Sequence, residues 1–195
     1  MTGNIGGLPV VMRRAVFLDR DGTLGGDGGY CHHDAFRLFA NAASAIRLPN
    51  EAGNLVIVVT NQTHIGHGEI TLEQVAASFR RLNVELAAEG AHLDGWYICP
   101  HRKADACRCR KPSPSLLQQA AQERGLDLAS SWMVGDSGAA DMLAGAAAGC
   151  RLILVRTGWG ENSLGAYRHT WADVQPDYVA ADVLAAARSI VARST

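Results

Sequence analysis

The sequence predicts an α/β fold, a doubly wound, Rossmann-like parallel sheet with helices on both faces. Short runs of branched and aromatic residues alternate with Ala- and Leu-rich stretches along the whole chain, which is the order that a helix-covered parallel sheet produces. Polar, reactive residues follow directly after several of these apolar runs. Ligands of doubly wound sheets bind beyond the carboxyl ends of the strands, so these residues are expected to meet in space.

Six apolar runs are predicted to be strands because each is rich in β-branched or aromatic residues. They are residues 15–18, 55–60, 95–99, 132–135, 152–155 and 178–179. The clearest helix is 71–89, which opens with a capping box of Thr71 and Gln74 and ends before Gly90. A second helix is predicted over 112–124, with Pro112 in its first turn.

The length and composition indicate one ordinary globular domain. A chain of 195 residues fits a single core, and we expect a flexible N-terminal segment over 1–12 and one domain over 13–195. The formal charge of -1 and the 48% hydrophobic content do not suggest a nucleic-acid partner. The apolar runs are much shorter than the roughly 20 residues of a membrane-spanning helix, and the start lacks signal-peptide features. A cytoplasmic monomer without a membrane partner is therefore expected.

Two aspartates follow the first strand, in the run Asp19-Arg20-Asp21-Gly22-Thr23. Residues two apart at a strand end project to the same side, so both carboxylates can face one site. Neighbouring carboxylates repel unless a cation lies close by, and Mg²⁺ is a natural partner. One carboxylate can attack phosphorus while the other exchanges a proton with the leaving oxygen. An Asp-rich turn is the alternative interpretation.

Three further motifs come after strands or before a predicted helix. The run Thr60-Asn61-Gln62-Thr63 offers donors that suit phosphate oxygens, although a polar turn is the alternative. Arg110 and Lys111 precede Pro112, so a helix starting there would place two cations at an anion-binding N-terminus; a solvated basic patch is the alternative. Asp136 can supply another metal ligand, with a helix cap as the alternative, and Asp141 can orient Lys111 or a metal-bound water.

Three cysteines and a histidine crowd into one short stretch. They are Cys99, His101, Cys107 and Cys109. Three thiolates and one imidazole make a closed tetrahedral Zn²⁺ site, and the C-x-H and C-x-C pairs are close enough for one loop, 99–109, to surround the ion. With every position filled by protein, the zinc is expected to be structural and to hold the loop that carries Arg110 and Lys111. Four unconnected polar residues are the alternative.

The order of these motifs resembles the haloacid dehalogenase superfamily of aspartate-nucleophile phosphotransferases. The resemblance extends from Ala15 to about Gly160. It implies Asp19 as nucleophile and Asp21 as general acid and base. It also implies Thr60 and Lys111 as phosphoryl-stabilising groups, Mg²⁺ bound by Asp19, Asp136 and the Asp21 backbone carbonyl, and Asp141 as the second acid of the last motif.

The zinc loop inside such a chain looks like the D-glycero-D-manno-heptose 1,7-bisphosphate 7-phosphatases, with histidinol-phosphate phosphatases as close relatives. The resemblance implies that the sugar is held by Asp27, Gly28, Gly29, Tyr30 and Arg110, next to Asn61, Gln62 and Thr63. The sequence departs from that pattern at Ser137, where the heptose enzymes typically have lysine. It also departs at His64 and His67, which replace glycine and arginine and are expected to be rim or surface residues, and the zinc loop is shorter.

The spacing of the motifs leaves little room for a cap domain. Only 38 residues separate Asp21 from Thr60, and they must supply a helix and a strand. We therefore expect a capless phosphatase of small phosphorylated molecules, with heptose bisphosphate as first substrate and histidinol phosphate or another small phosphate as alternatives. A non-catalytic, phosphate-binding module built on the zinc loop is a competing hypothesis, which the paired carboxylates Asp19 and Asp21 disfavour.

Overall fold

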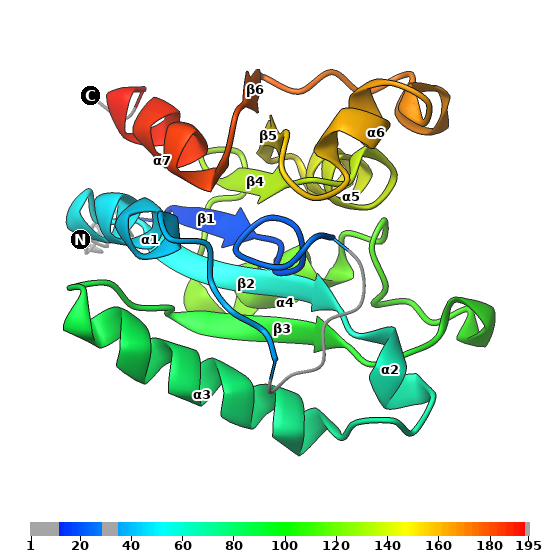
Figure 1. Cartoon of the computed structure of the whole chain (residues 1–195). Coiled ribbons are helices and arrows are strands. Elements are labelled where there is room, and N and C mark those ends of the chain that lie inside the picture. Colours follow the sequence, from blue (N-terminus) through cyan, green and yellow to red (C-terminus); the bar gives the residue numbers. More distant parts are fainter. Residues whose placement is uncertain (1–11, 29–34, 194–195) are drawn as a thin grey trace, which may run out of the picture.

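Six parallel strands form one sheet in the computed structural model, which describes residues 12–28 and 35–193. The strand order is β3-β2-β1-β4-β5-β6, so the sheet grows in opposite directions from a switch point between β1 and β4. Figure 1 shows the arrowheads of β1 to β4 pointing the same way. The strands are β1 (Ala15–Leu18), β2 (Leu55–Asn61), β3 (Gly95–Cys99), β4 (Trp132–Gly135), β5 (Arg151–Val155) and β6 (Tyr178–Ala180). Each lies within one residue of its predicted bounds.

Helices and short turns connect these strands. The helices are α1 (Ala42–Glu51), α2 (Thr63–Gly66), α3 (Leu72–Ala88), α4 (Ser115–Arg124), α5 (Leu143–Ala148), α6 (Gly160–Leu164) and α7 (Val183–Ala192). The short turns are the 3₁₀ segments η1 (Lys103–Asp105) and η3 (Arg168–Trp171) and the π-helical turn η2 (Gly138–Met142). Between β1 and β2 the described residues contain only one helix, α1, and no separate cap domain.

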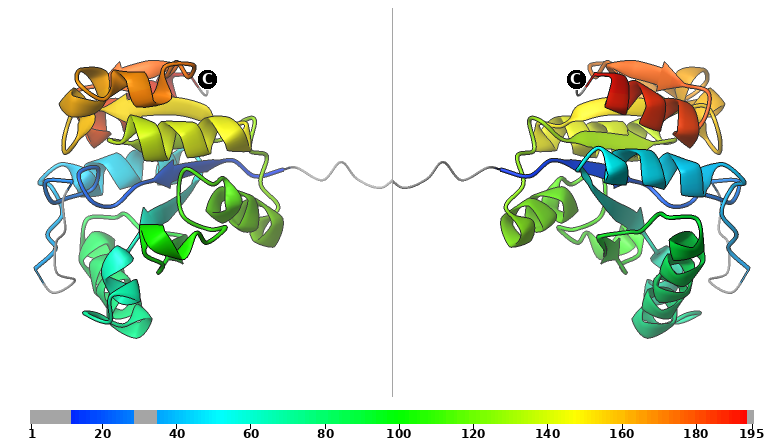
Figure 2. Two further views of the ribbon diagram at one scale, coloured as in Figure 1. Left: turned by 90° about the vertical axis from the view of Figure 1, so that its right-hand side faces the viewer. Right: turned by 90° about the vertical axis from the view of Figure 1, so that its left-hand side faces the viewer.

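Side chains of the central strands alternate between the two faces of the sheet. In β1, Val16 and Leu18 join one core cluster while Ala15 and Phe17 join the other, as the two-residue period of a strand requires. The first cluster packs against α1, α3 and α7, and the second against α4, α5, η2 and η3. Figure 2 shows helices on both sides of the sheet, and the predicted doubly wound architecture is confirmed.

Helix α3 has the predicted capping box. The Gln74 backbone N–H donates to Thr71 Oγ1 at 3.1 Å, and the Thr71 N–H donates to Gln74 Oε1 at 2.8 Å. These two bonds satisfy donors that the first helical turn leaves without backbone partners. At the other end Gly90 has a φ of +72°, which glycine tolerates and which ends the helix.

Helix α4 begins later than predicted, at Ser115 rather than at Pro112. The Ser115 hydroxyl donates to the Arg108 carbonyl at 2.7 Å, which holds the preceding residues in a turn instead of a first helical turn. The expectation that Arg110 and Lys111 flank the N-terminus of a helix is therefore wrong. Both are positioned by side-chain contacts instead, as described below.

The predicted domain bounds stay a prediction. Residues 1–11 of the expected N-terminal segment lie outside the described residues, while 12–28 and 35–193 contribute to one sheet and its two helical layers. In that part of the chain, no helix combines the length and apolarity needed to cross a membrane.

Candidate active site

Three buried carboxylates meet at the switch point of the sheet. Asp19 follows β1, Asp136 follows β4, and Asp141 lies in η2. One oxygen from each lies within 4.8 Å of the others, and the three residues are only 8%, 3% and 1% exposed. Three carboxylates so close together in a poorly solvated place repel one another strongly unless cations compensate them.

Lys111 is the cation that the chain itself supplies. Its Nζ donates to Asp19 Oδ1 and to Asp141 Oδ1, both at 2.6 Å, and to the Val59 carbonyl at 2.8 Å. Burial lowers the pKa of Lys111, but the charges of Asp141 and Asp19 outweigh it and hold that pKa above its ordinary value. The ammonium group therefore stays charged and balances one of the three carboxylates.

Asp136 is the third carboxylate of the cluster, and Lys111 donates to the other two. Burial first, and then the charges of Asp19 and Asp141, raise the pKa of Asp136 to about 8. A carboxylate resists ionisation in this way when no cation faces it. Mg²⁺ prefers carboxylate and carbonyl oxygens, so this donor set fits a divalent hard cation.

Close-packed glycines surround the Asp136 carboxylate. Gly22 has a φ of +87° and Gly158 a φ of +56°, and a Cβ added at either would lie 2.0 or 2.1 Å from Asp136 Oδ2. The same oxygen accepts a hydrogen bond from the Trp159 backbone N–H at 2.7 Å. Glycine is required at both positions because a side chain would displace the carboxylate.

Asp21 lies beside this cluster, and neighbouring side chains donate hydrogen bonds to its carboxylate. Gln62 Nε2 donates to Asp21 Oδ2 and to Thr60 Oγ1, both at 2.9 Å. Arg20 Nη1 donates to both Asp21 oxygens at 2.9 and 3.2 Å, while its guanidinium lies 3.8 Å above the Phe36 ring. Burial raises the pKa of Asp21, although Arg20 opposes this, so the site favours a carboxyl group that can carry a proton.

Asn61 and Thr63 position the two basic residues. The Asn61 side-chain amide and the Lys111 backbone exchange hydrogen bonds, with the Lys111 N–H donating at 3.1 Å and its carbonyl accepting at 3.2 Å. Arg110 Nη1 donates to Thr63 Oγ1 at 2.8 Å and to the His101 carbonyl at 3.3 Å. Thus the end of β2 and the start of α2 hold Arg110 and Lys111 in place.

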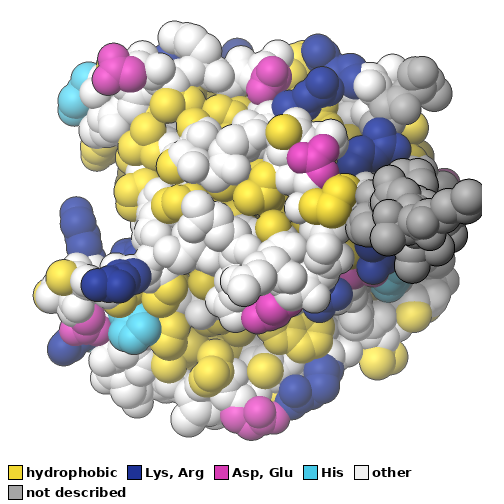
Figure 3. Space-filling view, turned by 180° about the vertical axis from the view of Figure 1, so that it is seen from behind, with side chains coloured by type: hydrophobic (Ala, Val, Ile, Leu, Met, Phe, Trp, Pro, Cys, Tyr) yellow, Lys and Arg dark blue, Asp and Glu magenta, His cyan; other side chains and the backbone are white. Residues whose placement is uncertain are grey.

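Many of these groups line a cavity of about 270 Å³. In the space-filling view, the edge at the carboxyl ends of the strands is deeply indented (Figure 3). The lining residues are Asp19, Asp21, Gly28, Thr60, Asn61, Arg110, Lys111, Asp136, Ser137, Ala140, Asp141 and Trp159. A phosphate group with part of its substrate fits a hollow of this size and polarity.

Several residues that were predicted to bind the substrate are not among those that line the cavity. Gly29 and Tyr30 lie outside the described residues, and Asp27 is exposed and does not line the cavity. Gln62 and Thr63 also do not line it; they contact Asp21 and Arg110 instead.

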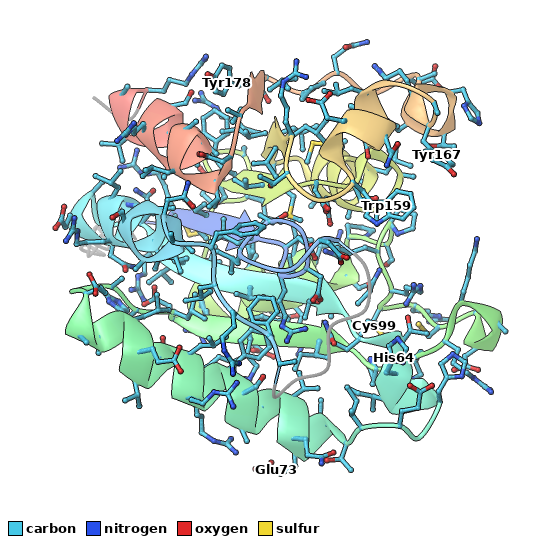
Figure 4. The ribbon with its side chains drawn as sticks, viewed as in Figure 1. His64, Glu73, Cys99, Trp159, Tyr167 and Tyr178 are labelled. Carbon is cyan, nitrogen blue, oxygen red and sulfur yellow. The ribbon has the colours of Figure 1, made fainter. Side chains whose placement is uncertain are left out.

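The roles of Arg20 and Trp159 were not predicted from the sequence. Trp159 lies in a Gly-rich turn after β5, where neither spacing nor charge marks it. Arg20 lies between Asp19 and Asp21, and only these two aspartates were assigned a role from the motif. His64, expected at the rim or surface, forms a 2.6 Å contact from Nδ1 to Glu69 Oε2, and it is labelled on α2 in Figure 4.

The four predicted zinc ligands come together after β3. The sulfur atoms of Cys99, Cys107 and Cys109 lie 3.3 to 3.7 Å apart, and His101 Nδ1 lies 3.8 and 3.3 Å from the sulfurs of Cys99 and Cys109. Tetrahedral Zn²⁺ with bonds of about 2.3 Å places its sulfur ligands about 3.8 Å apart. The cluster therefore has the size and donor set of a Cys₃His metal site.

The thiols of this cluster differ in their readiness to ionise. Burial raises the pKa of Cys99 to about 12. Burial also acts on Cys107, but the backbone N–H groups of Arg110 and Cys109 oppose it and the pKa falls to about 7. A bound cation favours the thiolate form of all three cysteines. Cys107 ionises readily even without the metal, whereas Cys99 depends on the metal to become a thiolate.

The chain is similar in sequence and structure to known phosphatases. Residues 108–186 match the family model of HAD-hydrolase-like proteins. The D-glycero-beta-D-manno-heptose-1,7-bisphosphate 7-phosphatase of Yersinia pestis is 42% identical over 153 residues, which are 74% of this chain and 81% of that protein. The D-glycero-D-manno-heptose-1,7-bisphosphate 7-phosphatase of Thermosynechococcus vestitus is 40% identical over 187 residues, or 89% and 93% of the two chains.

One similar crystal structure contains ligands. It is the D,D-heptose 1,7-bisphosphate phosphatase from B. bronchiseptica, complexed with magnesium and phosphate. It matches this chain with a TM-score of 0.79 and 31% identity, over 92% of this chain and 99% of that one. The likeness covers almost the full length of both proteins.

Proposed function

The chain belongs to the D-glycero-D-manno-heptose-1,7-bisphosphate 7-phosphatase family of the haloacid dehalogenase superfamily, and from this premise we propose that it removes the 7-phosphate of that sugar. It is a phosphoric monoester hydrolase. The observation that carries the proposal is the cluster of three buried carboxylates held around one lysine at the switch point of the sheet.

Asp19 is the proposed nucleophile. Its carboxylate lies at the floor of the cavity, directly after β1, and Lys111 holds it in place. A carboxylate oxygen of Asp19 forms a bond to the phosphorus while the bond from phosphorus to the sugar oxygen breaks. The product of this step is an aspartyl phosphate and a sugar oxygen that needs a proton.

Asp21 is the proposed proton donor. It lies in the same cavity, and its two oxygens are oriented by Arg20 and Gln62. It gives its proton to the leaving sugar oxygen, and as a carboxylate it then takes a proton from the water that hydrolyses the aspartyl phosphate. The site returns to its starting state with inorganic phosphate released.

Charge on the transferring group is balanced by residues that face it. Lys111 and Thr60 line the cavity beside Asp19 and are proposed to bind the phosphoryl oxygens. The residues that would hold Mg²⁺ are Asp19, Asp136 and the Asp21 backbone carbonyl, and the ion when bound would neutralise phosphoryl charge. Asp141 Oδ1 accepts a hydrogen bond from Lys111 Nζ at 2.6 Å and so helps to position the ammonium group.

The cysteine cluster is proposed to bind a structural zinc ion through Cys99, His101, Cys107 and Cys109. The spacing of its ligand atoms supports this role. All four positions are protein ligands, so the loop has no open coordination site for catalysis. Its proposed task is to keep Arg110 next to Thr63 at the mouth, where the guanidinium binds the substrate.

We further propose that the protein is a monomer and acts on a small phosphorylated sugar in the cytoplasm. The described cysteines are free thiols, which agrees with a reducing compartment. The formal charge of -1 gives no support for a nucleic-acid partner.

The direct test replaces Asp19 by Asn. The variant should release phosphate from D-glycero-D-manno-heptose 1,7-bisphosphate with Mg²⁺ at a rate lower by on the order of 10³-fold or more, because an amide cannot form the phosphoenzyme. Its unfolding temperature should not fall, since the change removes one of several repelling charges. Phosphate release and the position of the remaining phosphate, read by ³¹P NMR, are the measurements.

Asp173→Asn is the matched control. Asp173 is exposed beyond η3, so this variant should keep the wild-type rate. Substantial turnover by folded Asp19→Asn protein would remove Asp19 from the mechanism. A higher kcat/KM for histidinol phosphate than for the heptose bisphosphate would reject the substrate assignment and leave the phosphatase chemistry in place.

A further inference from the structure

Two exposed aromatic side chains lie together at the mouth of the catalytic cavity. Trp159 is 44% exposed and Tyr167 is 49% exposed, and their ring centroids lie 6.0 Å apart in an edge-to-face arrangement. Figure 4 shows the pair on the same side of the molecule as the strand ends, whereas Tyr178, also exposed, lies away from them near β6. Single exposed aromatics are common, but an adjacent pair beside a polar site is a feature to explain.

Trp159 is held rigidly by the catalytic loops. Its backbone N–H donates to Asp136 Oδ2 at 2.7 Å, and the Thr157 hydroxyl donates to the Gly22 carbonyl at 2.7 Å. Gly28 packs so closely on the indole that a Cβ added there would lie 2.3 Å from Trp159 Cδ1. The indole therefore has a defined position relative to the carboxylates, as a substrate platform needs.

The mouth of the site has two chemically different sides. Beside Trp159 lies a hollow of about 170 Å³, lined by Ser137, Ala139, Trp159, Ser163, Tyr167 and Thr170, without a charged side chain. On another side lies a hollow of about 350 Å³ whose lining includes Lys103, Arg110 and Lys111. Both hollows share lining residues with the catalytic cavity, so each adjoins it.

The neutral side has few polar groups left to bind a ligand. Ser163 Oγ donates to the Asp136 carbonyl and accepts from the Gly138 N–H, and Thr170 Oγ1 donates to the Tyr167 carbonyl. What remains are the aromatic faces and the hydroxyls of Ser137 and Tyr167. A second phosphate finds cations in the hollow lined by Lys103, Arg110 and Lys111, whereas the C–H face of a sugar skeleton packs well on aromatic rings.

We propose that Trp159 and Tyr167 form a platform that binds the uncharged carbon skeleton of the sugar phosphate and thereby determines substrate specificity. The inference rests on the proposed sugar-phosphatase function and adds two residues to it. The platform favours phosphates carried on a sugar over phosphates of small molecules that have no ring or polyhydroxy chain.

The test compares a sugar phosphate with a phosphate that cannot reach the platform. Trp159→Ala and Tyr167→Ala should each raise KM for the heptose bisphosphate by about three- to ten-fold, with kcat within about two-fold, because the contact lies away from the reacting bond. The ratio of kcat/KM for the sugar phosphate to that for acetyl phosphate should fall by the same factor. Trp159→Phe should recover most of the loss.

Substrate binding to a variant that cannot hydrolyse it provides a second measurement. In Asp19→Asn protein, adding Trp159→Ala should weaken binding of the heptose bisphosphate, measured by calorimetry, by about three- to ten-fold. Tyr178→Ala is the matched control and should leave KM unchanged, since Tyr178 lies on β6 outside the cavity linings.

The outcomes separate this inference from the proposed function. If wild-type protein hydrolyses the heptose bisphosphate but Trp159→Ala keeps its KM, or loses kcat/KM equally for both substrates, the platform is rejected and the phosphatase assignment stands. If wild-type protein hydrolyses acetyl phosphate but not the sugar phosphate, the proposed substrate and the platform are both rejected.

Discussion

At the scale of single residues, the site depends on how the chain balances buried charge. Lys111 is 4% exposed and lies between Asp19 and Asp141. A buried ion pair adds little stability compared with an apolar pair, but removing one partner leaves an uncompensated charge. Lys111 therefore matters for stability as well as for catalysis.

Replacing Lys111 by Met should abolish phosphatase activity and lower the free energy of unfolding by about 3–5 kcal/mol, because it leaves three buried carboxylates without an internal cation. Urea unfolding and phosphate release measure the two effects. Added Mg²⁺ should recover part of the stability and none of the activity, if the ion binds the same carboxylates.

Arg188→Met, an exposed change on α7, is the control and should leave both quantities unchanged. Wild-type stability of a folded Lys111→Met protein would contradict this account of the buried charges.

At the scale of elements, two connections bring the basic residues to the acidic ones. The segment after β3 folds around the cysteine cluster, and the α2 turn packs closely on it: a Cβ at Gly66 would lie 2.9 Å from the Pro100 carbonyl. Arg110 then spans the gap between the two segments, from the His101 carbonyl to Thr63. Loops of this kind keep their shape only when something other than a helix or strand fixes them.

Removing the proposed zinc should therefore loosen the position of Arg110. Cys107→Ser should lower the zinc content below one equivalent, and it should lower kcat/KM for the sugar phosphate by roughly 10- to 100-fold, as loss of metal-supporting groups commonly does. Metal analysis and steady-state kinetics in excess Mg²⁺ are the measurements.

Cys150→Ser changes a cysteine outside the cluster and should retain the full zinc content. A zinc-free Cys107→Ser protein with wild-type kcat/KM would show that the loop does not need the ion to position Arg110.

At the scale of the whole molecule, the sheet links the active site to global stability. The site residues follow β1, β2 and β4, and these strands form the middle of the sheet with both faces covered by apolar side chains. A small domain of this kind usually unfolds in one cooperative step. The catalytic constellation is therefore expected to be lost together with the core.

Ile57→Ala should lower the free energy of unfolding by about 2–5 kcal/mol, because Ile57 is fully buried in β2 and its loss leaves a cavity. Activity and circular dichroism should disappear at the same urea concentration. Val84→Ala, on the exposed side of α3 at 74% exposure, is the control and should change stability by no more than about 0.5 kcal/mol. Loss of activity well before loss of structure would contradict a single cooperative unit.

The sequence was sufficient to predict the strands and the parallel sheet. Strand propensity is a local property, so residues such as Phe17 and Ile57 could be assigned to a buried strand without a structure. The start of α4 was wrong because the Ser115 hydroxyl contact with the Arg108 carbonyl competes with a helical turn, and no local pattern predicts its strength.

By itself, the sequence determined which chemical groups the protein has and which of them follow strands, because these are properties of short segments. Only the tertiary structure decided which groups meet. Lys111 reaches Asp19 across 92 residues of chain, and Trp159 reaches Asp136 through its backbone rather than its side chain. Such contacts depend on strand order and on loops packed to within a few tenths of an ångström, and neither is encoded in the residues of one segment alone.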